Sequence, residues 1–141
     1  MLNFPLPVFS SQDVHPILVN FTAALVPASI GSDALGKCFR KQSLTHAAWW
    51  MLVYAAAITP FTVLAGWIWK RSVGPMLPPP LITIHQWLGT SLAALFLALA
   101  AWRFTIHSND RTPTIPYFVL ALIILAALVY QGSLGGKMAF P

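Results

Sequence analysis

The chain has 141 residues, of which 57% are hydrophobic and only 8% are charged, whereas about a quarter of the residues of a soluble domain are charged. Eight Lys and Arg and three Asp and Glu residues are too few to cover a water-exposed surface of this size, so a soluble globular domain is excluded. The net charge of +5 does not indicate nucleic-acid binding, because the cations fall between apolar segments, as juxtamembrane cations do. The composition predicts an integral membrane protein whose solvent is the lipid bilayer.

Four apolar segments follow one another along the chain, and each reaches the length of about 20 residues that a helix needs to cross a bilayer. They span about residues 16–36, 44–69, 82–104 and 115–134. Long runs without alternation of polar and apolar residues favour helices over barrel strands, the only two structures that satisfy the backbone in lipid. We predict an all-α fold, an integral membrane four-helix up-down bundle that forms a single transmembrane domain over residues 1–141.

The segments outside the predicted helices fit this topology. Residues 1–14 contain no Lys or Arg, so we expect an interfacial lead-in rather than a cleaved signal peptide. Residues 70–81 contain four prolines and are predicted to form a stiff extended loop. The six tryptophans fall near the ends of the second and third helices, in the interfacial layer that Trp prefers: Trp49, Trp50, Trp67, Trp69, Trp87 and Trp102.

The distribution of Lys and Arg predicts the orientation in the membrane. The first-to-second and third-to-fourth loops hold five cations: Lys37, Arg40, Lys41, Arg103 and Arg111. The other side holds three: Lys70, Arg71 and Lys137. Because the cation-rich side faces the cytoplasm, both termini are predicted to be non-cytoplasmic.

The sequence shows few groups with which to run transport or catalysis. Asp33 is the only acid within a predicted helix and falls near its end, so no carboxylate is expected at mid-membrane. Ion-coupled carriers need ionisable groups on a central path, and hydrolysis needs a nucleophile with its base or a phosphate-binding loop. The lone Cys38 allows neither an intrachain disulfide nor a cysteine metal cluster. We therefore expect a protein that is not an enzyme.

The four histidines form two pairs by depth. The first and third helices of an up-down bundle run in the same direction, so His15 and His85, each near the start of its helix, lie near one membrane face. His46 opens the second helix and His107 follows the third, so these two lie near the opposite face. His85 and His107 are roughly 33 Å apart along an ideal helix, so the two pairs are separate sites.

Two imidazoles on facing helices can hold a haem between them. His15 and His85 are therefore the candidate iron ligands of a haem b. For His46, which lies beside Trp49, interfacial anchoring competes with cofactor binding, and His107 is followed by the polar residues 108–111 and is interpreted as a solvated loop residue. The sequence favours the first pair over the second as a cofactor site.

Two stretches match patterns of one known family. Residues 15–25 read HPILVNFTAAL, close to its opening pattern HPxLVHFPIAL, and residues 130–140 read YQGSLGGKMAF, close to its closing pattern SGWLGGELVY. Asp33 within GSDALG and the helix exit AGWIWKR match as well. The chain thus resembles the bacterial membrane family called domain of unknown function 2231. Asn20 stands where the opening pattern has its second histidine, and Lys137 where an acid commonly follows the final glycines. The resemblance implies a four-helix bundle in the bacterial inner membrane.

Two functions remain for such a chain. The first is a non-catalytic subunit or anchor of a larger bacterial membrane complex, which we expect to be a redox complex. In this function the chain would bind haem or another tetrapyrrole as a cofactor. Small residues that permit close helix contact favour it: Ala23, Ala24, Ala28, Ala55, Ala56, Ala57, Gly89, Ala93, Gly132 and Gly136. The second is a b-type haem electron-transfer protein that exchanges electrons with quinone at an aromatic rim of Trp67, Trp69 and Trp87. We place the subunit first.

Overall fold

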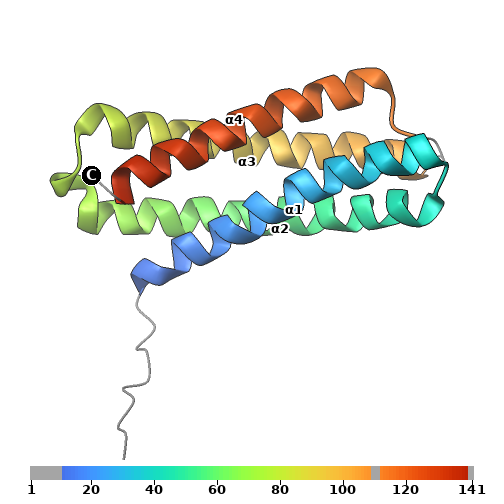
Figure 1. The fold of residues 1–141 in the computed structure, drawn as a ribbon. Coiled ribbons are helices and arrows are strands. Elements are labelled where there is room, and N and C mark those ends of the chain that lie inside the picture. The colour runs from blue at the N-terminus through green and yellow to red at the C-terminus, as the bar shows by residue number, and fades with distance from the viewer. Residues whose placement is uncertain (1–10, 109–111, 140–141) are drawn as a thin grey trace, which may run out of the picture.

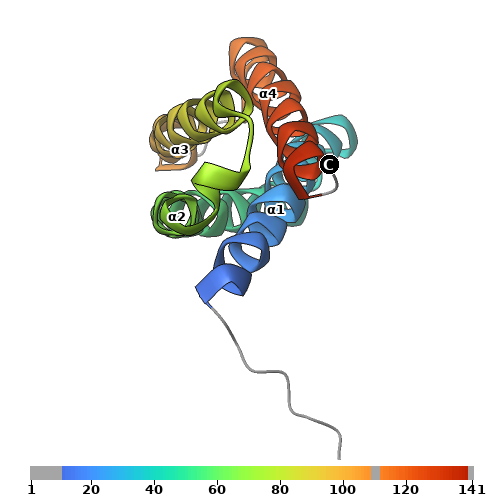
Figure 2. The same cartoon turned by 90° about the vertical axis from the view of Figure 1, so that its left-hand side faces the viewer.

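The computed structural model describes residues 11–108 and 112–139 and contains four long helices packed in sequence order (Figure 1). They are α1 (Ser11–Phe39), α2 (Gln42–Val73), α3 (Pro79–Ser108) and α4 (Ile115–Ala139), with a short 3-10 helix η1 (Gly74–Met76) after α2. Viewed along the bundle, each helix lies beside the next one in the chain, and α1 and α3 occupy diagonal corners (Figure 2). The predicted all-α four-helix bundle is confirmed.

Every helix is long and apolar enough to cross a bilayer, and each extends beyond its predicted span. α1 already begins at Ser11, so residues 11–14 are helical, and the rest of the predicted lead-in, residues 1–10, lies outside the described residues. The apolar pattern marks only the part of a helix that lies in hydrocarbon. Because helical hydrogen bonds are internal, the backbone continues in the same conformation into the headgroup layer.

The predicted loop over residues 70–81 is wrong in extent. α2 continues to Val73, so Lys70 and Arg71 lie in its last turn, and α3 begins at Pro79. Prolines predict a break in a helix interior, but in the first turn their missing N–H has no helical partner to lose. The N–H groups of Leu81 and Ile82 donate to the carbonyl oxygen of Pro78, and these are the first hydrogen bonds of α3.

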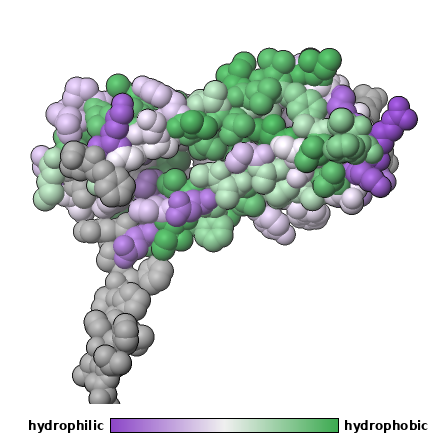
Figure 3. All heavy atoms as spheres, in the orientation of Figure 1, coloured by the Kyte–Doolittle hydropathy of each residue, from purple (hydrophilic) through white to green (hydrophobic). Residues whose placement is uncertain are grey.

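The interior of the bundle is small and the apolar surface is large. The core is formed by residues from all four helices: Val26, Ile30, Leu52, Ala55, Leu92, Phe96, Leu99, Ile106, Tyr117, Ala121 and Ile124. Other large apolar side chains point outward, such as Phe61 on α2, which is 65% exposed. Figure 3 shows a broad apolar surface over the middle of the bundle and hydrophilic residues toward its ends. This distribution suits a helix bundle surrounded by lipid tails.

A tight turn joins α1 to α2. Arg40 adopts a left-handed conformation with φ 53°, and the N–H of Lys41 bonds to the carbonyl of Gly36 at 2.9 Å. A methyl group on Gly36 would lie 2.6 Å from Oγ1 of Thr45. The absence of a side chain at Gly36 therefore lets the end of α1 approach the start of α2.

Candidate functional site

The structure brings His15 of α1 and His85 of α3 together between diagonal helices. Their ring centroids are 6.4 Å apart and the ring planes are nearly perpendicular, at 82°. Trp69, near the end of α2, lies 5.8 Å from His15. Both histidines are half-buried. We call this group of three side chains the His15–His85 site.

The ring of His15 is fixed by α2. Its Nδ1 lies 2.9 Å from the carbonyl oxygen of Thr62, and since a carbonyl only accepts, Nδ1 carries the proton and donates. Nε2 then keeps its lone pair, which is the form of imidazole that ligates a metal. The ring fits against Gly66, where a methyl group would lie 2.9 Å from its Cε1 atom.

His85 is placed by α4. A methyl group on Gly135 would lie 3.3 Å from Cε1 of His85, and Nε2 of Gln131 donates to the backbone carbonyl of His85 at 2.8 Å. Gln131 in turn fits against Gly89, where a methyl group would lie 2.8 Å from its Nε2. Glycines on α2, α3 and α4 thus leave room for the polar side chains at this end.

Three buried polar atoms around this site have no hydrogen-bond partner among the described residues: Nδ1 of His85, Nε1 of Trp69 and Oε1 of Gln131. Buried polar atoms are normally paired, so unpaired ones need an explanation such as a bound group. A metal–imidazole bond is about 2.0 Å long, and with the ring radius a metal between two opposed imidazoles separates their centroids by about 6 Å. The observed separation of 6.4 Å is close to this value, and at an angle of 82° it is also that of an edge-to-face contact between two rings.

A second histidine pair lies at the opposite end of the bundle. The ring centroids of His46 and His107 are 5.7 Å apart, and the indole of Trp49 stacks on His107 at 5.1 Å with an angle of 15°. The interpretation of His107 as a solvated loop residue is wrong, because α3 continues to Ser108 and His107 is half-buried. His46 is exposed.

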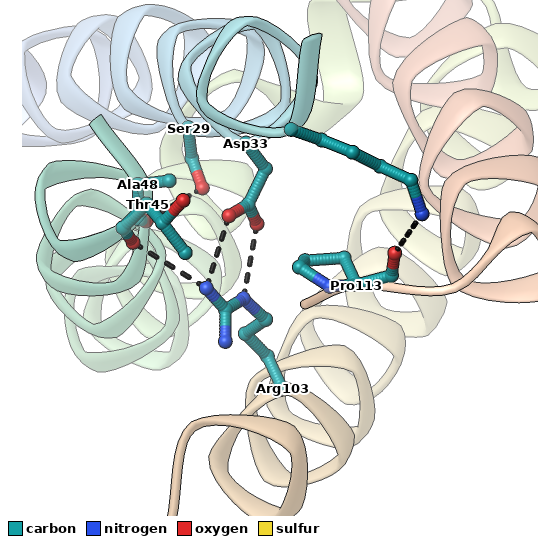
Figure 4. Close-up of polar contacts among 7 residues, drawn as sticks. Ser29, Asp33, Thr45, Ala48, Arg103 and Pro113 are labelled. Carbon is teal, nitrogen blue, oxygen red and sulfur yellow. Dashed lines mark hydrogen bonds and ion pairs between the residues drawn. The ribbon is translucent and has the colours of Figure 1, made fainter. Parts of the chain in front are cut away.

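A buried ion pair that was not predicted from the sequence joins α1 to α3 (Figure 4). Nε and Nη2 of Arg103 each donate to one carboxylate oxygen of Asp33 at 3.0 Å, and Nη2 also lies 3.4 Å from the carbonyl oxygen of Thr45 on α2. Both charged side chains are fully buried. Arg103 was predicted to be a loop cation, and this prediction is wrong because α3 extends past it and its charge is paired inside the bundle.

The predicted topology is sufficient to indicate that Asp33 and Arg103 lie close together. α1 and α3 run in the same direction, and Asp33 and Arg103 both fall near the ends of their predicted spans. The depth argument that pairs the histidines therefore pairs these two residues as well. Opposite charges at one depth within a bundle are expected to meet, because an unpaired charge is costly in lipid.

Comparison with known families covers nearly the whole chain. The sequence model of a family described as "Predicted membrane protein (DUF2231)" matches residues 11–141. No curated protein and no solved structure matches the chain. The matched range contains all four helices and both histidine pairs. The chain therefore belongs to the DUF2231 family of membrane proteins.

Proposed function

We propose that this chain is a non-catalytic membrane subunit of a bacterial redox complex and that it holds a haem b between His15 and His85. The observation that carries the proposal is the approach of these two rings from diagonal helices to 6.4 Å. The proton on Nδ1 of His15 is donated to the Thr62 carbonyl, which leaves the lone pair of Nε2 free to ligate iron. A haem with two imidazole ligands supplies one-electron transfer.

The side chains around the pair support this assignment. Trp69 contributes an aromatic surface beside His15, as a flat macrocycle needs. Trp67 and Trp87 contact each other edge to face at 5.9 Å and are exposed. Together with Trp69 they form an aromatic rim on α2 and α3, on which a quinone could stack to exchange electrons.

A visible spectrum of the purified protein tests the proposal. Dithionite reduction is expected to give a sharp alpha band, because two imidazoles make the iron low-spin. His85→Ala is expected to abolish the band, and His107→Ala at the other end of the bundle is expected to leave it intact. Circular dichroism of both variants controls for folding. A protein that is colourless in both redox states and takes up no added haemin would refute haem binding.

A second candidate, an anchor without a cofactor, has its own support on α4. Gly132 and Gly136 are exposed, and nothing lies within 4 Å of a methyl group placed on either. This pair, spaced as in GxxxG, is therefore not used within the bundle, and in lipid such a surface favours contact with another helix. Co-purification of a colourless wild type with redox subunits, lost on Gly132→Leu, would favour this function over haem binding.

A further inference from the structure

A cavity of about 270 Å³ opens at the end of the bundle that carries His46 and His107. The end of α1, the start of α2, the end of α3 and the chain after α3 all contribute to it. It is lined by Gly36, Lys37, Arg40, Gln42, Thr45, His46, His107 and Thr112. Nothing in the proposed function of the His15–His85 site uses this cavity.

The lining is rich in donors, and none of the lining residues that the structure describes is a carboxylate. Lys37 and Arg40 are cationic, and His46, His107, Gln42, Thr45 and Thr112 add ring, amide and hydroxyl donors. The Asp33 carboxylate lies at the same end of the bundle, but Arg103 engages both of its oxygens. Both charged side chains in the described part of the lining, Lys37 and Arg40, are therefore cations.

The cationic side chains of the lining favour an anion over a metal ion as the occupant. Two imidazoles whose centroids are 5.7 Å apart could share a cation, but Lys37 and Arg40 in the same lining would repel it. The start of α2 at Gln42 lines the cavity, and so do the ends of α1 and α3, so the helix dipoles oppose one another and the side-chain cations decide the preference.

The two cations, Lys37 and Arg40, lie at the end of α1 and in the turn to α2. The ammonium group of Lys37 donates to the carbonyl oxygen of Pro113 at 2.7 Å, which ties the end of α1 to the segment before α4. Arg40 is held at the turn in its left-handed conformation. Arg40 lines the cavity, and a guanidinium group can offer paired N–H donors to a tetrahedral oxyanion.

We propose that this cavity binds a phosphate group, with Arg40, His46 and His107 as donors. The cavity lies at the end of the membrane-spanning helices, at the depth of lipid headgroups. A phospholipid headgroup and free inorganic phosphate present the same chemistry to it, and the experiment separates them.

The experiment compares two variants of the full chain purified in a non-ionic detergent. Arg40→Asn with His107→Gln removes two donors, and Asn tolerates the left-handed backbone at position 40. Arg71→Gln removes the same formal charge from the exposed end of α2 at the other face and serves as the matched control. One arm measures retained phosphatidylglycerol by native mass spectrometry, and the other measures binding of inorganic phosphate by isothermal titration calorimetry.

We expect the double variant to bind its probe about tenfold more weakly than the wild type, because charge-assisted hydrogen bonds are lost, and Arg71→Gln to match the wild type. Loss confined to the lipid arm identifies a headgroup site, and loss in the calorimetry arm identifies a site for free phosphate. Equal binding by the wild type and the double variant in both arms overturns the proposal. So does a wild type that binds neither probe.

Discussion

The glycine at position 66 decides where the ring of His15 lies. Gly66→Ala would place a methyl group 2.9 Å from Cε1 and 3.0 Å from Nδ1 of His15, so the ring must shift away from α2, which strains its hydrogen bond to Thr62. We expect a loss of about 1–3 kcal/mol in the free energy of unfolding, typical of overpacking, together with loss of the low-spin alpha band. Unfolding in detergent and reduced spectra measure the two effects.

Gly132→Ala is the matched control for this substitution. Nothing lies within 4 Å of a methyl group at Gly132, and alanine is the better helix former, so stability should stay the same or rise by up to about 1 kcal/mol. If the two alanine variants unfold alike, the packing of His15 against Gly66 does not constrain the ring.

The positions of single side chains were only partly predictable from the sequence. The order of the helices, which alternate in direction, is enough to place His15 and His85 near the same membrane face. The contacts of His15 with Thr62 and Gly66 depend on the rotation of α2 about its axis. Rotation cannot be found from an apolar sequence, since lipid-facing and core-facing positions are both hydrophobic.

Among the helices, the Asp33–Arg103 pair fastens α1 to α3 across the diagonal of the bundle. Asp33→Asn would leave the buried guanidinium of Arg103 without a counter-charge, and we expect a loss of about 3–5 kcal/mol in the free energy of unfolding. Replacing both residues, as in Asp33→Leu with Arg103→Met, should recover most of this loss, because no buried charge is left unpaired.

Unfolding of both variants by sodium dodecyl sulfate, followed by circular dichroism, measures these effects. The double variant controls for the change in side-chain shape at the two positions. A single Asp33→Asn variant as stable as the wild type would show that the ion pair contributes nothing to the packing of α1 with α3.

Helix ends were the elements least well predicted. The proline-rich sequence predicts a loop at Pro79 and Pro80, yet both lie in the first turn of α3, where proline is tolerated. Arg103 ends an apolar run and therefore resembled a loop cation, although its charge is paired inside the bundle. The hydropathy of a segment reflects the free energy of transferring its side chains from water into lipid. It contains no information on where a helix starts or on whether a charged side chain is paired inside the bundle.

For the whole molecule, the four helices return the chain to the face from which it starts, and the first residue of α1 and the last of α4 lie toward the same end of the bundle (Figure 1). With Arg103 buried, the α1–α2 and α3–α4 side keeps four loop or helix-end cations: Lys37, Arg40, Lys41 and Arg111. The other side has three: Lys70, Arg71 and Lys137. We still predict that both termini are non-cytoplasmic.

Reporter fusions at each terminus test this prediction in bacterial cells. A reporter that is active only outside the cytoplasm should be active at both ends, and a fluorescent reporter that matures only inside should be dark at both. Reporters on opposite sides would contradict an even number of crossings. Two cytoplasmic termini would keep the helix count and refute the charge argument.

The separation of Asp33 and Arg103 along the chain, 70 residues, sets an order of assembly during synthesis. α1, which carries Asp33, is synthesised before α2 and α3. The Asp33 carboxylate therefore has no counter-charge until Arg103 on α3 has been made. Until α3 arrives, Asp33 must stay near water or protonated. The buried Asp33 carboxylate therefore gains its counter-charge only once α3 has been synthesised.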